Sequence, residues 1–402
     1  MLSSNHEKKV FGFGKNVTVA GLVSFFMDVS SEMIYPLVPL FLANVLGVNK
    51  SVIGLIEGIA ESTASLLKVF SGWFSDRIGN RKWLMAAGYG ISTLSRPFVA
   101  LATSWQHVLG SRFIDRFGKG IRTAPRDAII AESADKTHLG RAFGFHRAMD
   151  TMGAVVGPAL AFFFLGLFSN DYCKVFWLSM IPGILAVILN ILFITEKKKL
   201  PAAHAERPRL RLSHFDWRFK FFVIIAALFA AGNSSDVFLI LRAEQKGVHA
   251  AMIPVVYLLF NLVYSLSSVP AGMAADKFGK KRVILLGFIL FSALYYGFAI
   301  AGSPTAIWVL FGLYGLFMGL TEGIQKAFLA TIIPQDFKAT AFGVYNTVVG
   351  LAMFPASLIG GWLWDHVSPS ATFYFGAMTA AVSGTLFIVF ITVVRRTDAA
   401  RS

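Results

Sequence analysis

The sequence predicts an all-α membrane protein with twelve transmembrane helices, arranged as two pseudo-symmetric six-helix bundles. Of its 402 residues, 55% are hydrophobic and only 15% are charged, compared with about 25% charged residues in an average soluble domain. A spanning helix with a short loop uses roughly 30 to 35 residues, and 402 divided by 12 gives 33.5. An internal repeat, described below, supplies the third observation. The low charge excludes an ordinary soluble enzyme.

Continuous apolar stretches give the position of each expected helix. The first six are expected at about 17–46, 51–75, 83–103, 105–131, 141–168 and 172–194, and the second six at about 218–245, 252–275, 283–301, 305–333, 340–364 and 371–394. These runs lack the period-two alternation of strands. The polar, basic stretch 195–217 separates them, so we predict bundles at 1–194 and 218–402 joined by a linker.

The distribution of charge predicts the orientation in the membrane. Lys and Arg number 37 and Asp and Glu 22, a net charge of +15. The basic residues fall in short clusters between the apolar spans, as the positive-inside rule requires, and not in one nucleic-acid-binding patch. Both termini and the linker are therefore predicted to be cytoplasmic, in a multi-pass protein of a bacterial inner membrane. The first span, near 17–46, has no cleavage site close behind a short apolar core and is expected to stay in the membrane.

Two segments of the chain recur at nearly the same spacing. SGWFSDRIGNRKW at 71–83 aligns with AGMAADKFGKKRV at 271–283, an offset of 200 residues, and LGRAFG at 139–144 aligns with KATAFG at 338–343, an offset of 199. Two separate matches at nearly one offset indicate that the halves are parallel structural repeats.

The repeated segment resembles the loop signature of the major facilitator superfamily, G-x-x-x-D-[RK]-x-G-[RK]-[RK], and the resemblance covers essentially the whole chain. The first copy contains Gly72, Asp76, Arg77, Gly79, Arg81 and Lys82, with Asn80 at one basic position, and the second contains Gly272, Asp276, Lys277, Gly279, Lys280, Lys281 and Arg282. The resemblance implies a secondary transporter with a central cavity lined by helices 1, 4, 7 and 10.

The same resemblance implies gating residues at the cytoplasmic ends of the helices. They are Gly72, Asp76, Arg77, Arg81, Asp127, Gly272, Asp276, Lys277 and Lys281. A carboxylate such as that of Asp76 can dock on the N-terminus of another helix, favoured by the helix dipole. The family implies helix 11, beginning near Thr340, as the partner of Asp76, and helix 5, beginning near Gly140, as the partner of Asp276. The alternative is that the basic residues only set the topology.

Further residues are similar to motifs of the twelve-helix drug:proton antiporters. Helix 1 contains Pro36-Leu37-Val38-Pro39, helix 4 contains Arg112, and helix 5 contains Gly153-x-x-x-Gly157-Pro158. The resemblance implies proton-coupled export. Ala161 departs from the helix 5 motif, at a position where a glycine is usual, and the two glycines can equally serve close helix packing.

Charged residues inside the spans are the candidates for proton coupling, because charge in lipid is costly unless it is paired or hydrated. Asp28 and Glu32 lie one turn apart on a polar face of helix 1, near mid-membrane. Two carboxylates so close disfavour double ionisation, so the pair can take up and release a proton. Glu61 and Asp150 are the other candidates for proton coupling.

The candidates for substrate binding are polar residues of the spans expected around the cavity. They are Tyr35, Arg112, Asp115, Arg116, Lys119, Arg147, Asn233, Asp236, Glu322, Gln325 and Lys326. The basic residues of helix 4 need water, acids or an anionic ligand. Two alternatives remain open: Asp115 can simply neutralise Arg112 or Arg116, and Glu322 with Lys326 can form an i, i+4 pair.

These observations predict a proton-coupled secondary transporter of a small organic solute, working by alternating access. The motif resemblances favour an efflux antiporter, whereas the basic face of helix 4 favours a symporter that imports an anionic metabolite or siderophore. The sequence lacks H-E-x-x-H, G-x-S-x-G and P-loop motifs, so an enzyme or an ATP-driven pump is not expected. The doubled gate disfavours a static channel. We expect a monomer in the lipid bilayer, with the proton as coupling ion and no cofactor, metal or nucleic acid.

Overall fold

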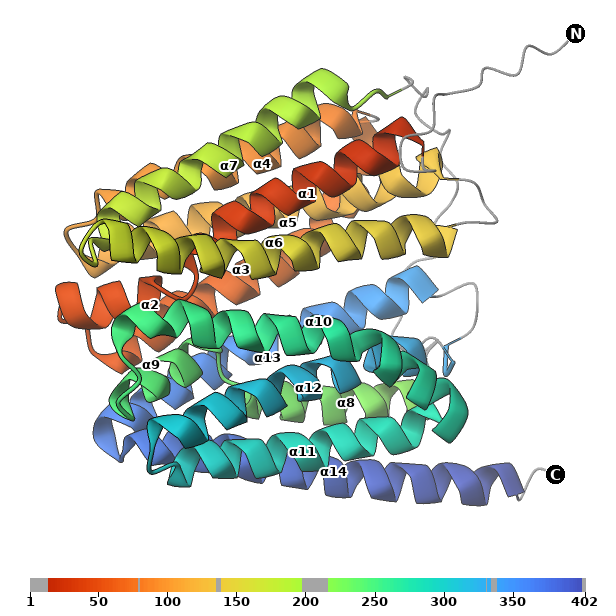
Figure 1. The fold of residues 1–402 in the computed structure, drawn as a ribbon. Helices are drawn as coiled ribbons and strands as arrows, with labels where there is room; N and C mark the ends of the chain where they lie inside the picture. Colours follow the sequence, from red (N-terminus) through yellow and green to blue (C-terminus); the bar gives the residue numbers. More distant parts are fainter. Residues whose placement is uncertain are drawn as a thin grey trace, which may run out of the picture. The chain divides into compact units, whose positions relative to one another are not determined.

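The computed structural model describes residues 14–78, 80–134, 139–196, 216–329, 331–333 and 338–399, which fold into helices joined by short connections (Figure 1). The helices are α1 (Lys15–Ile34), α2 (Val38–Leu40), α3 (Lys50–Ile78), α4 (Arg81–Ala100), α5 (Trp105–Ser133), α6 (Leu139–Leu167), α7 (Tyr172–Phe193), α8 (Trp217–Gly232), α9 (Val237–Gln245), α10 (Ile253–Phe278), α11 (Lys280–Ile300), α12 (Pro304–Leu329), α13 (Lys338–His366) and α14 (Pro369–Ala399).

The described helices form twelve segments of membrane-spanning length, at the twelve predicted positions. The first combines α1, α2 and a π-helical turn, Phe41–Val45, and the seventh combines α8 and α9. Nine of the segments in the described chain are apolar enough to cross a membrane by composition alone, and the other three are α3, α4 and α5. The predicted all-α, twelve-helix fold is confirmed.

The first and seventh segments are interrupted, where the sequence analysis predicted continuous spans. α1 ends at Ile34, just before Pro36, because proline has no N–H for the helical ladder and clashes with the preceding turn. α8 ends at Gly232 and α9 starts at Val237. A Cβ at Gly232 would overlap Thr379 of α14, so only glycine fits there. The two interruptions lie one repeat length apart in the chain.

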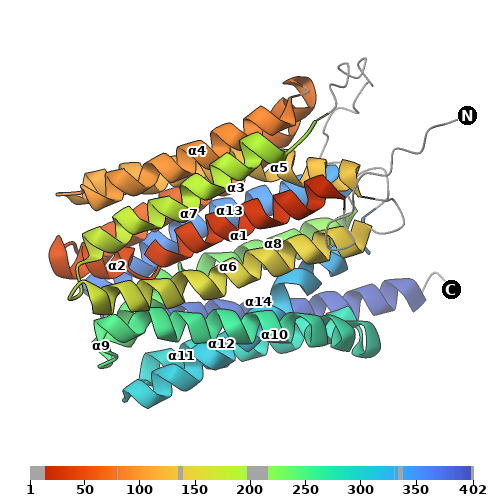
Figure 2. The same cartoon turned by 45° about the horizontal axis from the view of Figure 1, so that its top comes forward.

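The structure divides into two compact units, which are described separately. The first contains described residues of Met1–Val38 and Leu66–Ala205, and the second those of Pro39–Ser65 and Glu206–Ser402. In the first unit, α1 packs against α6 and α7, and α4 packs against α5 and α7 (Figure 2). In the second, α10 packs on α12, α11 on α14, and α8 on α13 and α14. Residues 197–215 of the predicted linker lie outside the described residues, and the predicted bundle boundaries remain a prediction.

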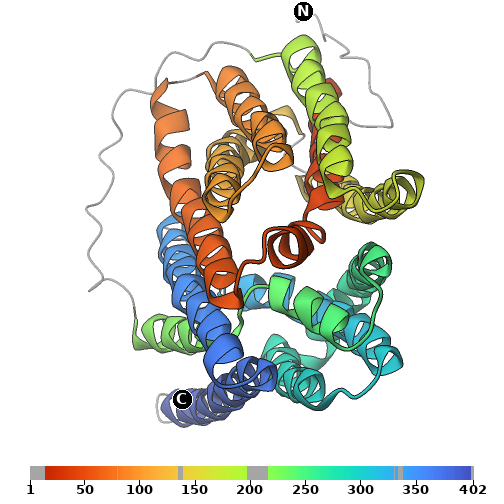
Figure 3. The ribbon, with the colours of Figure 1, turned by 90° about the vertical axis from the view of Figure 1, so that its left-hand side faces the viewer.

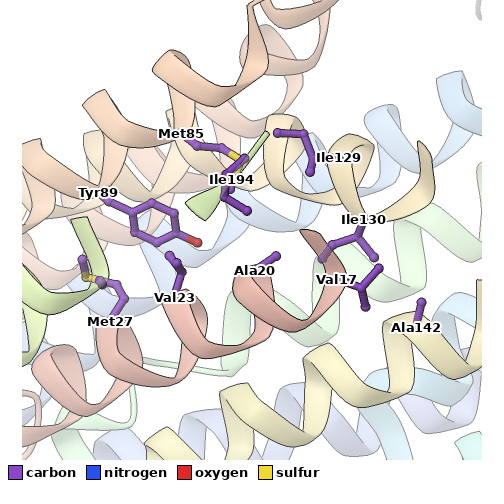
Figure 4. Packing of buried hydrophobic residues seen from close by; sticks show 11 residues of the cluster. Val17, Ala20, Val23, Met27, Met85, Tyr89, Ile129, Ile130, Ala142 and Ile194 are labelled. Carbon is purple, nitrogen blue, oxygen red and sulfur yellow. The ribbon is translucent and has the colours of Figure 1, made fainter. Parts of the chain in front are cut away.

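One face of α1 supplies the apolar core of the first unit (Figure 4). The residues of α1 in this core recur every three or four positions, which places them on one side of the helix. Its members include Val17, Ala20, Val23 and Met27 of α1, Met85 and Tyr89 of α4, and Ile129 and Ile130 of α5. Because this face is taken up by α4 and α5, the polar residues of α1 lie on its other sides.

Large apolar side chains also cover the outside of the helices. Phe163 of α6, Leu192 of α7 and Val269 of α10 are 60%, 64% and 71% exposed. A water-soluble surface carries such residues singly, whereas lipid tails favour them over a whole face. With the apolar lengths of the helices, this surface is that of a multi-pass integral membrane protein.

Candidate functional site

Asp28 and Glu32 lie where two glycines of α6 approach α1. A Cβ at Gly153 would stand 2.8 Å from the Cβ of Asp28, and a Cβ at Gly157 would stand 2.8 Å from the Cβ of Glu32. Both distances are shorter than any real contact between such atoms. The two glycines therefore let the α6 backbone lie directly against the two acidic residues of α1, which supports the close-packing interpretation of the glycine motif.

The Asp28 carboxyl belongs to a group of charges of both signs. It interacts electrostatically with Asp150 of α6 and Glu32 of its own helix, and with Lys119 and Arg122 of α5. The structure thus brings together three of the four predicted proton-coupling residues. The two cations compensate part of the negative charge of the three carboxyls.

His146 of α6 joins this group and was not among the predicted site residues. Its side chain is 4% exposed. Its Nε2 lies 2.7 Å from Ser24 Oγ of α1 and 3.6 Å from Asp150 Oδ1. The sequence did contain a signal, since His146, Asp150, Gly153 and Gly157 share one helix face by their spacing of four, three and four.

Arg96 of α4 is a second buried residue that the sequence analysis missed. Its side chain is 1% exposed and links three helices. Nη2 donates to Asp115 Oδ1 of α5 at 3.1 Å and to Ser31 Oγ of α1 at 2.9 Å, and Nε donates to Ser30 Oγ at 3.2 Å. Asp115 also lies 3.9 Å from Arg116 Nη1. The nearest cation to Asp115 is therefore Arg96, and a buried pair with satisfied hydrogen bonds fixes the packing of these helices.

The remaining basic residues of α5 contact aromatic and polar neighbours. The Arg112 guanidinium lies 5.5 Å from the ring centre of Tyr35, and that of Arg122 lies 4.8 Å from the ring centre of Tyr89, both within cation–π range. Arg122 also donates to Ser92 Oγ. Lys119 is half-buried, whereas Arg147, from α6, is exposed.

The second unit has its own polar group around Asp236. Tyr314 of α12 donates its hydroxyl to Asp236 Oδ1 at 2.8 Å. Asp236 also interacts electrostatically with Glu57 and Glu61 of α3, and Glu57 is 1% exposed. Tyr295 donates to Asn233 Oδ1 at 3.3 Å. Glu61 was predicted to couple protons and Asp236 to bind substrate, and the structure places their carboxyls in one group.

The three predicted binding residues of α12 have partners within the same unit. Lys326 Nζ lies 3.9 Å from Glu322 Oε1, as the i, i+4 alternative predicted. Tyr264 donates to the Glu322 carboxylate, and Tyr345 donates to Gln325 Oε1 at 2.9 Å. In the described part of the chain, no three His, Cys, Asp or Glu side chains gather as metal ligands do.

The first copy of the signature is only partly described. Gly72, Asp76 and Arg77 lie in α3, but their side chains are outside the described residues. Arg81 Nη1 lies 2.5 Å from Glu132 Oε1, whereas Asp127 accepts from Arg126 Nε at 3.0 Å. The pairing of Arg81 with Glu132 was not predicted.

A carboxylate also docks on the N-terminus of α4, next to the first copy of the signature. The backbone N–H groups of Arg81 and Lys82 donate to the two carboxylate oxygens of Glu196, at 3.0 and 2.8 Å. The interaction is the one predicted for Asp76, but here it is made within one unit.

In the second copy, the glycine of the turn has the backbone angle that the motif requires. Gly279 has φ +92° and separates α10 from α11, a conformation that other residues resist. Asp276 is exposed, with Lys280 Nζ at 3.7 Å. Lys277 Nζ lies 5.5 Å from the ring centre of Phe278, Gly272 lies within α10, and Lys281 is half-buried at the start of α11.

Twelve spanning segments, a repeated signature loop and charged side chains inside the bundles define a membrane transporter. A model of the Major Facilitator Superfamily matches residues 20–242 and 221–402. The chain therefore belongs to this superfamily.

Two relatives illustrate the range of sequence similarity. The uncharacterised MFS-type transporter MJ1317 of Methanocaldococcus jannaschii is 38% identical over 383 residues, covering 94% of this chain and 95% of the relative. A homologue of the multi-drug resistance efflux pump PmrA from Lactococcus lactis is 24% identical over 401 residues, covering 96% and 95%.

Solved structures agree in fold. A POT family transporter in complex with a thioalcohol-conjugated peptide superposes with a TM-score of 0.83 at 13% identity, covering 96% of this chain and 98% of that one. A bacterial homologue of the human lysosomal transporter Spinster gives a TM-score of 0.73 at 15% identity, covering 95% and 96%. Likeness at these identities shows the fold alone.

Proposed function

We propose that this protein is a proton-coupled secondary transporter that exports a small organic solute by alternating access. The observation that carries the proposal is the group formed by Asp28, Glu32 and Asp150 at the α1–α6 contact, beside two cations of α5. The three side chains are half-buried, and charge inside a spanning bundle is costly to retain and marks an ion pathway by default.

The arrangement has a physical route from proton binding to a change in packing. When the carboxylates are ionised, they attract Lys119 and Arg122 of α5. A bound proton removes one negative charge and weakens that attraction. Because the α6 backbone lies directly against α1 at Gly153 and Gly157, a shift of α1 also moves α6. Coupling needs this dependence of proton affinity on conformation.

Export is supported by similarity and not by the geometry alone. The Lactococcus relative is named as a homologue of a drug efflux pump. Pro36 and Pro39 in the first segment and Gly153 and Gly157 in α6 resemble the antiporter branch.

A second candidate is a symporter that imports an anionic solute. Arg112 is 4% exposed and lies within cation–π range of Tyr35. Arg116, about one helical turn further along α5, is 6% exposed. Guanidinium groups held in this way suit a carboxylate or phosphate, which they can bind through two hydrogen bonds.

Purified protein in liposomes tests the proposal and separates the two candidates. The probes are ethidium and tetraphenylphosphonium as cations, and citrate and benzoate as anions, each with an imposed pH gradient. An antiporter accumulates its solute when the interior is acidic, and a symporter does so when the exterior is acidic, whichever way the protein is inserted. Downhill exchange of a probe that neither gradient accelerates would contradict proton coupling.

A further inference from the structure

The N-terminus of α3 is held by a carboxylate from a distant part of the chain. Asp365, in the last turn of α13, accepts hydrogen bonds from the backbone N–H of Lys50 at 3.2 Å through Oδ1 and of Ser51 at 2.7 Å through Oδ2. The Ser51 hydroxyl also donates to Asp365 Oδ2 at 2.7 Å. The first N–H groups of a helix have no partner within it and carry the positive end of its dipole. A carboxylate is the group that such an end binds best.

The local sequence of α3 leaves these two N–H groups to Asp365. Asn49 accepts from the backbone N–H of Val52 at 3.0 Å, which caps the next position from within the chain. The first turn, Lys-Ser-Val-Ile, contains no acidic residue. The helix thus caps one donor by itself and depends on α13 for the two before it.

The contact between α3 and α13 continues along the first half of α3 (Figure 3). A Cβ at Gly361 would overlap the carbonyl of Lys50, and a Cβ at Gly54 would overlap that of Ser357. Further along, Ser62 Oγ donates to the carbonyl of Gly350 at 3.1 Å. As residue numbers rise in α3 they fall in α13, so the two helices run antiparallel from Lys50 to about Ser65.

We propose that Asp365 is a gating carboxylate, which holds α3 and α13 together at the end opposite to the signature loop. Opening of that end requires the Asp365 carboxylate to leave the N-terminus of α3 and the glycine contacts to separate. The proposal rests on alternating access, but it depends neither on proton coupling nor on the identity of the solute.

The same physical device is predicted at the other end of α3. Asp76 lies 26 residues after Lys50 in this helix, about 39 Å along its axis, and was predicted to dock on the N-terminus of the helix that is α13 here. In an antiparallel pair, a carboxylate near the C-terminus of each helix can cap the N-terminus of the other.

The test compares Asp365→Asn with Asp171→Asn. Asp171 caps the N-terminus of α7, the helix that directly follows it, and accepts from the Lys174 N–H at 3.2 Å. It therefore has the same chemistry as Asp365 but joins no distant segments. Both variants carry Cys173→Ser and the reporter Ser62→Cys, in lipid nanodiscs where both faces meet the reagent. Ser62 is 8% exposed, and the readout is its rate of reaction with a charged methanethiosulfonate.

We expect Asp365→Asn to raise the labelling rate by about three- to thirtyfold, which is the change in the open population that corresponds to the free energy of one helix cap. Asp171→Asn should leave the rate unchanged. Fraying of the first turn alone would not reach Ser62, twelve residues or about 18 Å further along the helix. Equal rates in the two variants would overturn the proposal.

A second variant covers the case in which Asp365→Asn does not fold. Ser51→Ala removes the hydroxyl that donates to Asp365 and to the Gly361 carbonyl at 3.3 Å but keeps both backbone donors. Ser51→Ala should raise the labelling rate by a smaller factor. An unchanged labelling rate in this variant would count against a gating role of Asp365. Neither labelling assay uses a solute or a pH gradient. A negative result for proton coupling in liposomes and a negative result for the gating role of Asp365 can therefore be told apart.

Discussion

The two units bury charge in different ways. Among the described side chains that are almost fully buried, the acidic, basic and histidine residues of the first unit are Arg96, Arg112, Asp115, Arg116, Arg122 and His146, whereas those of the second unit are Glu57 and Arg242. Around Asp236 the second unit has the carboxyls of Glu57 and Glu61 together with a tyrosine donor and stacked rings. The Tyr314 ring is centred 5.4 Å from that of Phe260 and 5.5 Å from that of Phe317.

The comparison shows that two halves related by a sequence repeat differ in the charge that they bury. A buried network of ion pairs responds strongly to gain or loss of one charge, because each partner left behind is desolvated and uncompensated. A carboxyl held by a tyrosine hydroxyl within an aromatic core responds much less. On this account the first unit couples protons, and the second supplies a firmer scaffold.

Removal of a buried arginine should have the largest effect, and it should differ between the units. Arg96→Met leaves Asp115 buried without its main partner, which costs about 3–5 kcal/mol. Arg242→Met removes hydrogen bonds to the carbonyls of Phe298 and Ala299, made at 2.9 and 2.6 Å, and should cost about 1.5–3 kcal/mol. Thermal unfolding in detergent measures both.

The matched control for this prediction restores neutrality. Arg96→Met combined with Asp115→Leu should recover much of the lost stability, since no charge is then left alone. If the double variant is no more stable than Arg96→Met, the ion pair is not what the arginine contributes.

A methyl group at the α1–α6 contact should have an intermediate effect. Gly153→Ala would bring a Cβ within 2.7 Å of the Phe25 carbonyl oxygen and should destabilise the protein by about 1–3 kcal/mol while slowing transport. Gly166→Ala, in the same helix but with no described atom within 4 Å of its Cβ, should be neutral or stabilising by up to about 1 kcal/mol. Equal melting temperatures in the two variants would mean that the close contact of α1 with α6 at Gly153 does not contribute to stability.

The smallest effect is expected in the second unit. Tyr314→Phe removes the hydroxyl that donates to Asp236 and should cost about 0.5–1.5 kcal/mol. Accumulation driven by a pH gradient should persist at a similar steady level. Loss of accumulation with normal downhill exchange would place proton coupling in the second unit as well.

Apolar length and repetition were enough to predict the fold. The span expected at 172–194 is α7, Tyr172–Phe193, and that expected at 283–301 lies in α11, Lys280–Ile300, because a continuous apolar run has few alternatives to a helix in lipid. The break after Ile34 could have been predicted from Pro36. The break at Asn233 could not, because no proline marks it and the contact of Gly232 with α14 comes from distant sequence.

The candidate site was predicted only in part, because spacing along one helix does not show which residues of different helices come into contact. Spacing along one helix placed Asp28 beside Glu32, but it could not show that Arg96, a single charge in an otherwise apolar span, meets Asp115 of the next helix. His146 was not predicted, because its hydrogen bond with Ser24 joins residues 122 positions apart. Asp365 follows an apolar span and has no motif, so only the antiparallel contact with α3 gives it a role.

The central claim is that the carboxylates of the first unit couple transport to protons, and one measurement tests it most directly. Asp28→Asn, Glu32→Gln and the second-unit variant Asp236→Asn are compared in liposomes for accumulation of a transported probe under an imposed pH gradient and for its downhill exchange. We predict that Asp28→Asn and Glu32→Gln lose accumulation but keep exchange, while Asp236→Asn keeps both. Full accumulation in Asp28→Asn and Glu32→Gln, or its loss in Asp236→Asn alone, would contradict the account.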